Sequence, residues 1–222
     1  MKLSDSTLTY LKNFSSINSG IVFQEGNVIR TISKQQNILV KATVSETFDE
    51  KFAIYDLNRF LALLGSLTDP SLEVSSEKKN IKIKSGASQT VYGLSDESLV
   101  VTPPAKELKV TGEVNFLLTK DIMSQVLKMA GILGLPNIAV RGDRSKVSIA
   151  ALDVKNQDSD VFSIEVGTTQ ADFEMIFSTE NFKMIPGDYN VSISSKGISH
   201  LKHTKEPVEY WIAIEAGSRY AE

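Results

Sequence analysis

The feature that most constrains the fold of this chain is an internal repeat, because its 222 residues read as two similar halves. Leu11-Lys12 near the start of the first half corresponds to Leu127-Lys128 near the start of the second. Further on, Ile54–Phe60 corresponds to Ile176–Phe182, and each segment reads as an apolar strand end, a helix-capping residue and a helix. Two matches in the same order indicate duplication, so we expect two domains of similar fold.

Four helices are expected, two in each half. Each begins after a residue type whose side-chain oxygen can accept hydrogen bonds from the free N–H groups of a first helical turn. These N-cap candidates are Ser4, Asp56, Thr119 and Ser178. After Asp56, apolar residues recur from Leu57 to Leu67 at the spacing of one buried helix face. We expect the first helix to end before Gly20, the third at Gly131 and the fourth at Pro186-Gly187.

Most of the remaining chain alternates as β-strands do. Ile21–Phe23 and Val28–Ile32 are expected to pair as one hairpin, and a second hairpin is expected over Ile138–Leu152. Tyr210–Ile214 is almost continuously apolar, as in a strand that is covered on both faces. The predicted fold class is therefore α+β, with two similar domains that each pack two helices on antiparallel sheets.

A stiff segment separates the two halves. It contains Thr102-Pro103-Pro104, whose two prolines favour an extended backbone. We therefore assign residues 1–98 to the first domain, residues 99–112 to an interdomain connector and residues 113–222 to the second domain.

Composition excludes several classes of protein. The chain has no cysteine, so it can form neither disulfides nor thiolate metal sites. It has no run of about 18 apolar residues and no secretion signal at its start, so we expect a soluble, intracellular protein without membrane contact. The net charge of −3 is unlike the basic excess of a simple DNA-binding domain.

The positions of the charged residues are more informative than the net charge. In the expected helices, acidic residues are confined to the cap or the first turn, where the helix dipole favours them. Beyond the first turn, the charged residues are Lys12, Arg59, Lys128 and Lys183, and Lys2 and Lys120 add positive charge at two helix starts. A single lysine on a solvated helix face is common, but four such faces also suit a concave surface that faces a polyanion. Contact with phosphate alone would not depend on DNA sequence.

Catalytic and metal sites are not indicated. His200 and His203 lie three apart in a strand-like stretch, so their side chains point to opposite faces. Asp153, Asp158 and Asp160 are typical of an acidic surface loop. There is neither a phosphate-binding loop nor a nucleophile elbow, so we expect no catalytic residue, no cofactor and no enzyme activity.

Several segments resemble the sliding clamps of T-even-type bacteriophages. These segments are Met1–Ser4, Leu11–Phe14, Ile17–Ile21, Ala53–Asn58, Lys183–Tyr189 and Ile212–Ala216. The resemblance implies a head-to-tail homotrimer, a pseudo-sixfold ring whose helices line the hole around double-stranded DNA and whose sheets form the outer wall. It also implies a DNA polymerase tethered through a short peptide, a clamp loader ATPase, late-transcription factors as further partners, and a place in the host cell cytoplasm.

The resemblance assigns roles to particular residues. The DNA-facing candidates are Lys2, Lys12, Arg59, Lys120, Lys128 and Lys183. The subunit-interface candidates are Thr90, Val91, Tyr92 and Leu94 in one strand and Phe162, Ile164 and Val166 in another. The partner-peptide pocket would include Val100, Val101 and Ala216, although the connector and the tail after Ala216 differ from the family pattern. The main alternative is a non-enzymatic phage accessory or virion protein that does not contact DNA.

Overall fold

The computed structural model of this chain describes residues 1–75, 77, 79–106, 108–156 and 158–221. The chain divides into two compact units, Met1–Lys106 and Glu107–Glu222. Residue 107 of the predicted connector and residue 222 of the tail lie outside the described residues.

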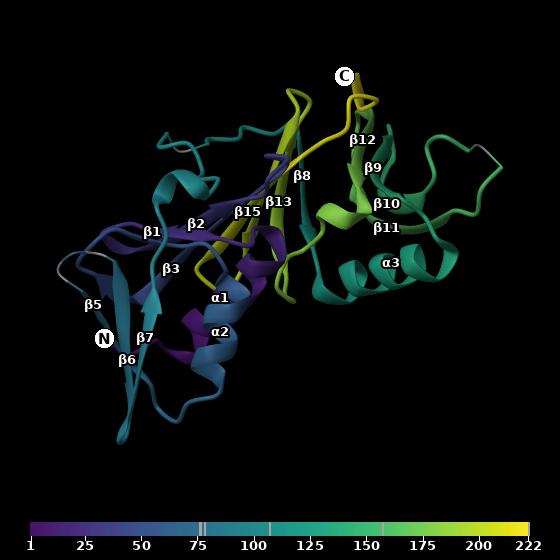
Figure 1. The fold of residues 1–222 in the computed structure, drawn as a ribbon. Helices are drawn as coiled ribbons and strands as arrows, with labels where there is room; N and C mark the ends of the chain where they lie inside the picture. The colour runs from purple at the N-terminus through teal and green to yellow at the C-terminus, as the bar shows by residue number, and fades with distance from the viewer. Residues whose placement is uncertain (76, 78, 107, 157, 222) are drawn as a thin grey trace. The chain divides into compact units, whose positions relative to one another are not determined.

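The first unit contains two α-helices that contact each other and three small groups of strands (Figure 1). Its elements are α1 (Asp5–Ile17), β1 (Ile21–Phe23), β2 (Gly26–Ile32), β3 (Ile38–Phe48), β4 (Phe52–Ile54), α2 (Leu57–Gly65), β5 (Ser71–Val74), β6 (Asn80–Ser85), β7 (Ser88–Gly93) and the 3-10 turn η1 (Glu97–Leu99). Strand β1 pairs with β4, β2 pairs with β3, and β6 lies between β5 and β7, all antiparallel.

The second unit is built from two antiparallel groups of strands and one α-helix. Its elements are β8 (Val114–Leu118), α3 (Lys120–Leu133), β9 (Asn137–Asp143), β10 (Lys146–Leu152), β11 (Phe162–Thr168), β12 (Asp172–Ser178), the 3-10 turn η2 (Thr179–Asn181), β13 (Tyr189–Ser194), β14 (Ile198–His203), β15 (Val208–Ala213) and β16 (Arg219–Ala221). One sheet has the order β11-β10-β9-β12-β16, and α3 packs against β10 and β11. The other strands follow one another in the order β15-β14-β13-β8.

The two units repeat the same order of elements, as the sequence predicts. Each contains a helix, four strands, a second helix or helical turn, and three strands. Strand β1 pairs with β4 just as β9 pairs with β12. The start of the second helical element is held in the same way in both units: Leu57 N–H donates to the carbonyl of Ser19 at 2.8 Å, and Thr179 N–H donates to that of Pro136 at 2.9 Å.

Three of the four predicted helices form with the predicted caps. The side chains of Ser4, Asp56 and Thr119 accept hydrogen bonds from backbone N–H groups in the first turns of α1, α2 and α3. The third helix runs past Gly131, which the prediction took as its end, and closes at Gly134 with a φ of 66°. Glycine adopts this left-handed conformation without a Cβ clash, so Gly134 is the favourable stop.

The fourth predicted helix is wrong in extent, because only the 3-10 turn η2 forms. Ser178 stands at its N-cap position but makes no side-chain capping hydrogen bond. Helix α2 buries Leu57, Phe60, Leu61 and Leu64 along one face, whereas the only buried residue of η2 is Asn181. Without an apolar stripe, and with Pro186 soon afterwards, the segment cannot gain enough packing energy to extend the turn.

The first predicted hairpin is also wrong, whereas the second is confirmed. Strand β1 pairs with β4 rather than with β2. The ring of Phe23 lies 4.7 Å from those of both Phe48 and Phe52, so an aromatic cluster holds β1 beside the end of β3 and the start of β4. Strands β9 and β10 pair as expected, with Ile138 opposite Ala151.

Candidate DNA-facing and partner-binding surfaces

Helices α1 and α2 each turn one face to the core and leave a basic residue on the other. Helix α1 buries Tyr10, Leu11 and Phe14, and Lys12 is exposed on the opposite side. Arg59 is likewise exposed on α2. Because the two helices contact each other (Figure 1), this part of the first unit presents two solvated cations on neighbouring helices.

Helix α3 repeats this arrangement in the second unit. It buries Met123, Val126 and Ala130 and exposes Lys120 and Lys128. Across α1, α2 and α3, acidic residues occur only at the cap or in the first turn, as the sequence shows. The other charged residues of the three helices are Lys12, Arg59, Lys120 and Lys128, all positive, which suits an anionic ligand.

Lys2 and Lys183 lie in different settings from the other DNA-facing candidates. Lys2 precedes α1, and its ammonium group forms an exposed ion pair with Asp69. Lys183 is exposed but lies beyond η2, so it is not on a helix face as predicted. The structure therefore places Lys12, Arg59, Lys120 and Lys128 on α-helices and the other two candidates on connecting segments.

Strand β7, which carries the first set of interface candidates, is an edge strand of its sheet. Among the described residues it pairs only with β6. Val91 is 58% exposed, and Thr90 and Tyr92 are half-buried. The Tyr92 ring meets Phe60 edge-on at 5.2 Å, which ties this edge to α2. Burial raises the pKa of Tyr92, the nearby Asp56 carboxylate raises it further, and Arg59 partly offsets both. Leu94 is half-buried just after the strand.

Strand β11, which carries the second set, is also an edge strand and pairs only with β10 among the described residues. Phe162, Ile164 and Val166 are half-buried and alternate with the exposed Ser163 and Glu165. Ile164 stands directly opposite the buried Ile149 of β10, so Phe162 and Ile164 lie on the face of the sheet that Ile149 buries, and Val166 lies at a shift in the register of the two strands. An apolar row along a free edge would gain further burial from a partner strand.

The predicted partner-pocket residues divide between the core and the surface. Val100 is buried in a cluster with Val22 and Ala53, so its side chain is not accessible as a pocket residue would be. Val101 is 38% exposed, and its carbonyl accepts a hydrogen bond from the Nδ2 of Asn18 at 3.0 Å. Ala216, in the second unit, is exposed.

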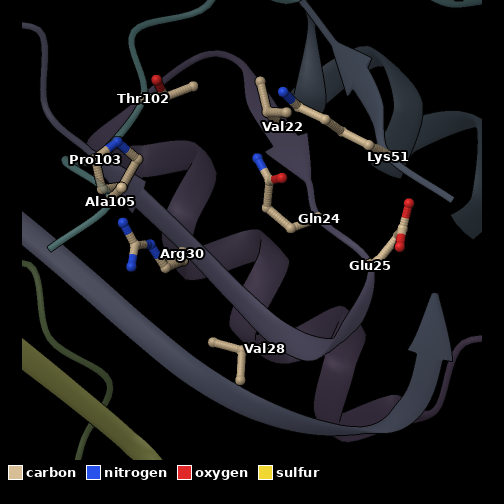
Figure 2. A pocket seen from close by; sticks show the side chains of 9 residues that line it. All are labelled: Val22, Gln24, Glu25, Val28, Arg30, Lys51, Thr102, Pro103 and Ala105. Carbon is tan, nitrogen blue, oxygen red and sulfur yellow. The ribbon is translucent and has the colours of Figure 1, made fainter. Parts of the chain in front are cut away.

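A cavity of about 500 Å³ lies beside Val101, between strands β1 and β2 and the start of the connector (Figure 2). We call it the connector cavity; it is lined by Val22, Gln24, Glu25, Val28, Arg30, Lys51, Thr102, Pro103 and Ala105. Figure 2 shows the connector residues on one side and Lys51 with Glu25 on the other. The guanidinium group of Arg30 donates to the carbonyl of Pro104 and so holds the connector over β2. Sequence reasoning missed Arg30 and Lys51, whose only signal was their charge.

The histidine pair has structural roles. His200 Nε2 lies 2.8 Å from a carboxylate oxygen of Glu209, and the His200 ring stacks on Trp211 at 4.8 Å. His203 is buried, and its Nδ1 accepts N–H hydrogen bonds from the turn after β14. In the part of the chain that the structure describes, no group of three His, Cys, Asp or Glu residues could hold a metal ion. No described helix is long and apolar enough to cross a membrane.

Comparison with known proteins decides between the two functional alternatives. A family model described as "DNA polymerase processivity factor" matches residues 2–102, and one described as "gp45 sliding clamp, C terminal" matches residues 115–216. The sliding clamp of Enterobacteria phage T4 is 32% identical over 228 residues, with 99% of each chain covered. That of Vibrio phage KVP40 is 31% identical over 223 residues, covering 97% of this chain and 100% of the relative. The chain belongs to the sliding-clamp family. It is thus a non-enzymatic DNA polymerase processivity factor, as the resemblance implied.

Solved structures show the same clamp fold at much lower identity. Proliferating cellular nuclear antigen from Entamoeba histolytica has a TM-score of 0.68 at 13% identity, with 94% of each chain covered. The A. fulgidus homologue, solved with the C-terminal region of FEN-1 bound, has a TM-score of 0.68 at 17% identity and 98% coverage of each chain. These likenesses confirm the predicted α+β fold with two domains of antiparallel sheets and helices.

Proposed function

We propose that this clamp is a head-to-tail homotrimer that encircles duplex DNA in the host cell cytoplasm and tethers the DNA polymerase for processive synthesis. The observation that carries this proposal is the set of solvated helix faces on α1, α2 and α3, whose charged residues are all positive except Asp5 and Asp121 in the first turns. An acidic helix surface would repel the phosphate backbone and a neutral one would not attract it, whereas these faces can contact it at any DNA sequence.

Weak contact suits a clamp that slides. Lys12, Arg59, Lys120 and Lys128 are exposed, so each would meet phosphate in the presence of water and screening salt. Lys2 and Lys183 would add to this contact from beside the helices. Retention on DNA would come from ring closure, and the tethered polymerase would stay at a high effective concentration near the primer end.

Ring closure would use the two edge strands. An exposed sheet edge is open to non-specific association unless something pairs with or covers it. In a head-to-tail ring, β7 of one protomer would meet β11 of the next, and closure would leave neither edge free. Thr90, Tyr92 and Leu94 would then become buried against Phe162, Ile164 and Val166, with Val91 at the rim. In this ring residues 1–98 and 113–222 act as the two similar domains, and residues 99–112 connect them.

Partner docking would use the surface around the connector. The A. fulgidus structure, which has the C-terminal region of FEN-1 bound, supports docking of a partner's terminal region on this fold. In the connector cavity, Lys51 pairs with Glu97, so Arg30 is the lining cation that could receive the carboxylate of an acidic peptide or a chain terminus. Val100 and Val101 in the first unit and Ala216 in the second remain our proposed partner-docking residues. The polymerase, the clamp loader ATPase and late-transcription factors would be peptide partners of this kind.

The test is a charge reversal on two helix faces. Replacing Lys12 and Lys128 together by Glu should impair loading onto primed circular DNA and processive synthesis with the polymerase and loader, because each phosphate contact becomes a repulsion. A matched control, Lys82→Glu with Lys196→Glu, makes the same change in net charge at exposed sites outside the helices. If the Lys12 and Lys128 variant is loaded and retained as well as the control, the helices do not face DNA.

A further inference from the structure

The second unit contains a hollow that the proposed clamp function does not use. We call it the loop groove: a cavity of about 510 Å³ above strands β9, β10 and β12, bordered by the loop between β10 and β11. Leu152 and Ile176 line its floor and belong to a buried cluster with two alanines of the same sheet. Val154 is 40% exposed and Val161 is 55% exposed at its rim. An apolar hollow with large exposed apolar side chains at its rim is typical of a binding surface.

Several described residues of the loop beside the groove are held by backbone hydrogen bonds. Asn156 N–H donates to the carbonyl of Asp153 at 3.2 Å, and Ser159 N–H donates to that of Asn156 at 3.2 Å. The N–H of Val154 donates to the Oδ1 of Asn137 at 3.3 Å, which fastens the loop to β9. These bonds reduce the ordering that the described residues of the loop would need on binding a ligand.

The charge at the rim of the loop groove is negative. Arg141 and Glu174 form an ion pair at 2.6 Å and neutralise each other, which leaves Asp153 as the remaining charge among the lining residues. The described part of the loop carries two further acids, Asp158 and Asp160, against one lysine. A bound segment with a basic side chain next to an apolar one would match both the floor and the rim.

The internal repeat gives the loop groove a counterpart in the first unit. The connector cavity occupies the corresponding place in the first unit, on β1 and β2, which correspond to β9 and β10. In both hollows the segment after the last strand of the repeat contributes to the wall, through Thr102, Pro103 and Ala105 in one case and Gly217 in the other. In the connector cavity Lys51 pairs with Glu97, which leaves Arg30 and Glu25 as one cation and one acid, whereas the loop groove keeps Asp153 after its own ion pair is set aside. Of the two hollows, the loop groove is therefore the one whose charge favours a basic segment.

We propose that the loop groove is a second peptide-docking site, which takes a short segment of a partner protein with an apolar anchor flanked by lysine or arginine. Leu152, Val154, Val161 and Ile176 receive the anchor, and Asp153 receives the basic side chain. The site is separate from the connector cavity and does not depend on what binds there.

Photo-crosslinking with two synthetic peptides tests the proposal. The probes are acetyl-Lys-photoleucine-Phe-Lys-amide and the same peptide with Glu in place of both lysines. The basic probe should crosslink to residues 152–156, 158–161 and 174–176 of the full-length clamp, more strongly than the acidic probe. Val154→Asp should reduce the crosslinking about tenfold, as the loss of an anchor contact does. The control Leu117→Asp, at a residue that is 49% exposed on β8, should leave it unchanged.

A gentler variant keeps the test decisive if Val154→Asp disturbs the loop. Asp153→Asn retains an oxygen for the N–H of Lys155, which donates to this side chain at 2.9 Å, but removes the charge. It should weaken capture of the basic probe and abolish the preference over the acidic one. Crosslinking that is spread over other surfaces, equal capture of both probes, or capture that neither variant alters would each overturn the proposal. Because none of these readouts involves DNA or the polymerase, they are independent of the proposed clamp function.

Discussion

Replacing Ile164 by Asp in strand β11 should convert the ring into monomers without unfolding the chain. Ile164 is half-buried in the isolated chain and lies on an edge that has no partner among the described residues. Closing the ring against β7 would remove the rest of this side chain from water. An aspartate at the same place would put a carboxylate against the apolar row of the partner strand.

The size of the effect follows from burial. Full burial of an isoleucine side chain contributes about 1.5–3 kcal/mol, so covering the exposed half contributes about 1 kcal/mol to each interface. Burying a carboxylate without a partner costs at least about 1 kcal/mol more. Each interface therefore loses about 2 kcal/mol, and a ring with three identical interfaces loses about 6 kcal/mol. The protein concentration at which half of the chains are in trimers scales with the square root of the trimer dissociation constant. A loss of about 6 kcal/mol therefore raises this concentration roughly a hundredfold.

Sedimentation velocity over a dilution series measures this shift. The control is Ser163→Asp, which adds the same charge to the same strand at an exposed position on the opposite face. We expect Ile164→Asp to sediment as a monomer at concentrations where the wild type and Ser163→Asp are trimers. Thermal unfolding should show that both variants fold. The reasoning is refuted if Ile164→Asp stays trimeric at low concentration, or if Ser163→Asp dissociates equally.

Two further predictions concern stability. Asp56→Ala removes the acceptor that caps α2 and should lower the free energy of unfolding by about 1 kcal/mol in denaturant titration. Ser178→Ala, at a cap position without a side-chain capping bond, should cause no comparable loss, and equal losses would contradict the cap assignment. Burial, reinforced by Tyr210, raises the pKa of Tyr189 above its ordinary value of 10.0, so the folded state keeps a proton that the unfolded state releases. Stability should therefore fall as the pH rises above about 10, and less steeply in Tyr189→Phe; identical melting curves against pH would contradict this.

Much of the fold follows from local patterns in the sequence. Ser4, Asp56 and Thr119 cap helices because a side-chain oxygen beside an apolar stripe determines a helix start with little help from distant residues. The partner of β1 depends instead on the cluster of Phe23, Phe48 and Phe52, which the chain brings together only on folding. Short spacing in the sequence predicted that β1 pairs with β2, whereas aromatic packing places β1 beside β4.

The same distinction between local patterns and long-range contacts applies to the candidate site. Lys12 and Lys128 could be placed on exposed helix faces because helical spacing determines which side chains face away from the core. The burial of Val100 could not be predicted, since its contacts with Val22 and Ala53 join segments that are far apart in the sequence. The loop groove escaped prediction for a related reason: Leu152 and Ile176 lie far apart in the sequence and meet only through the pairing of β10 and β12 with β9.

The most direct test of the central claim is retention on circular compared with linear DNA. The clamp is loaded onto a nicked circular plasmid with the loader and ATP, separated from free protein by gel filtration, and then treated with a restriction enzyme that cuts the plasmid once. A ring held by topology should stay with the circle in moderate salt and be lost when the DNA is linearised. Equal retention on both forms, or loss from the circle as fast as from the linear DNA, would mean that the protein does not encircle DNA.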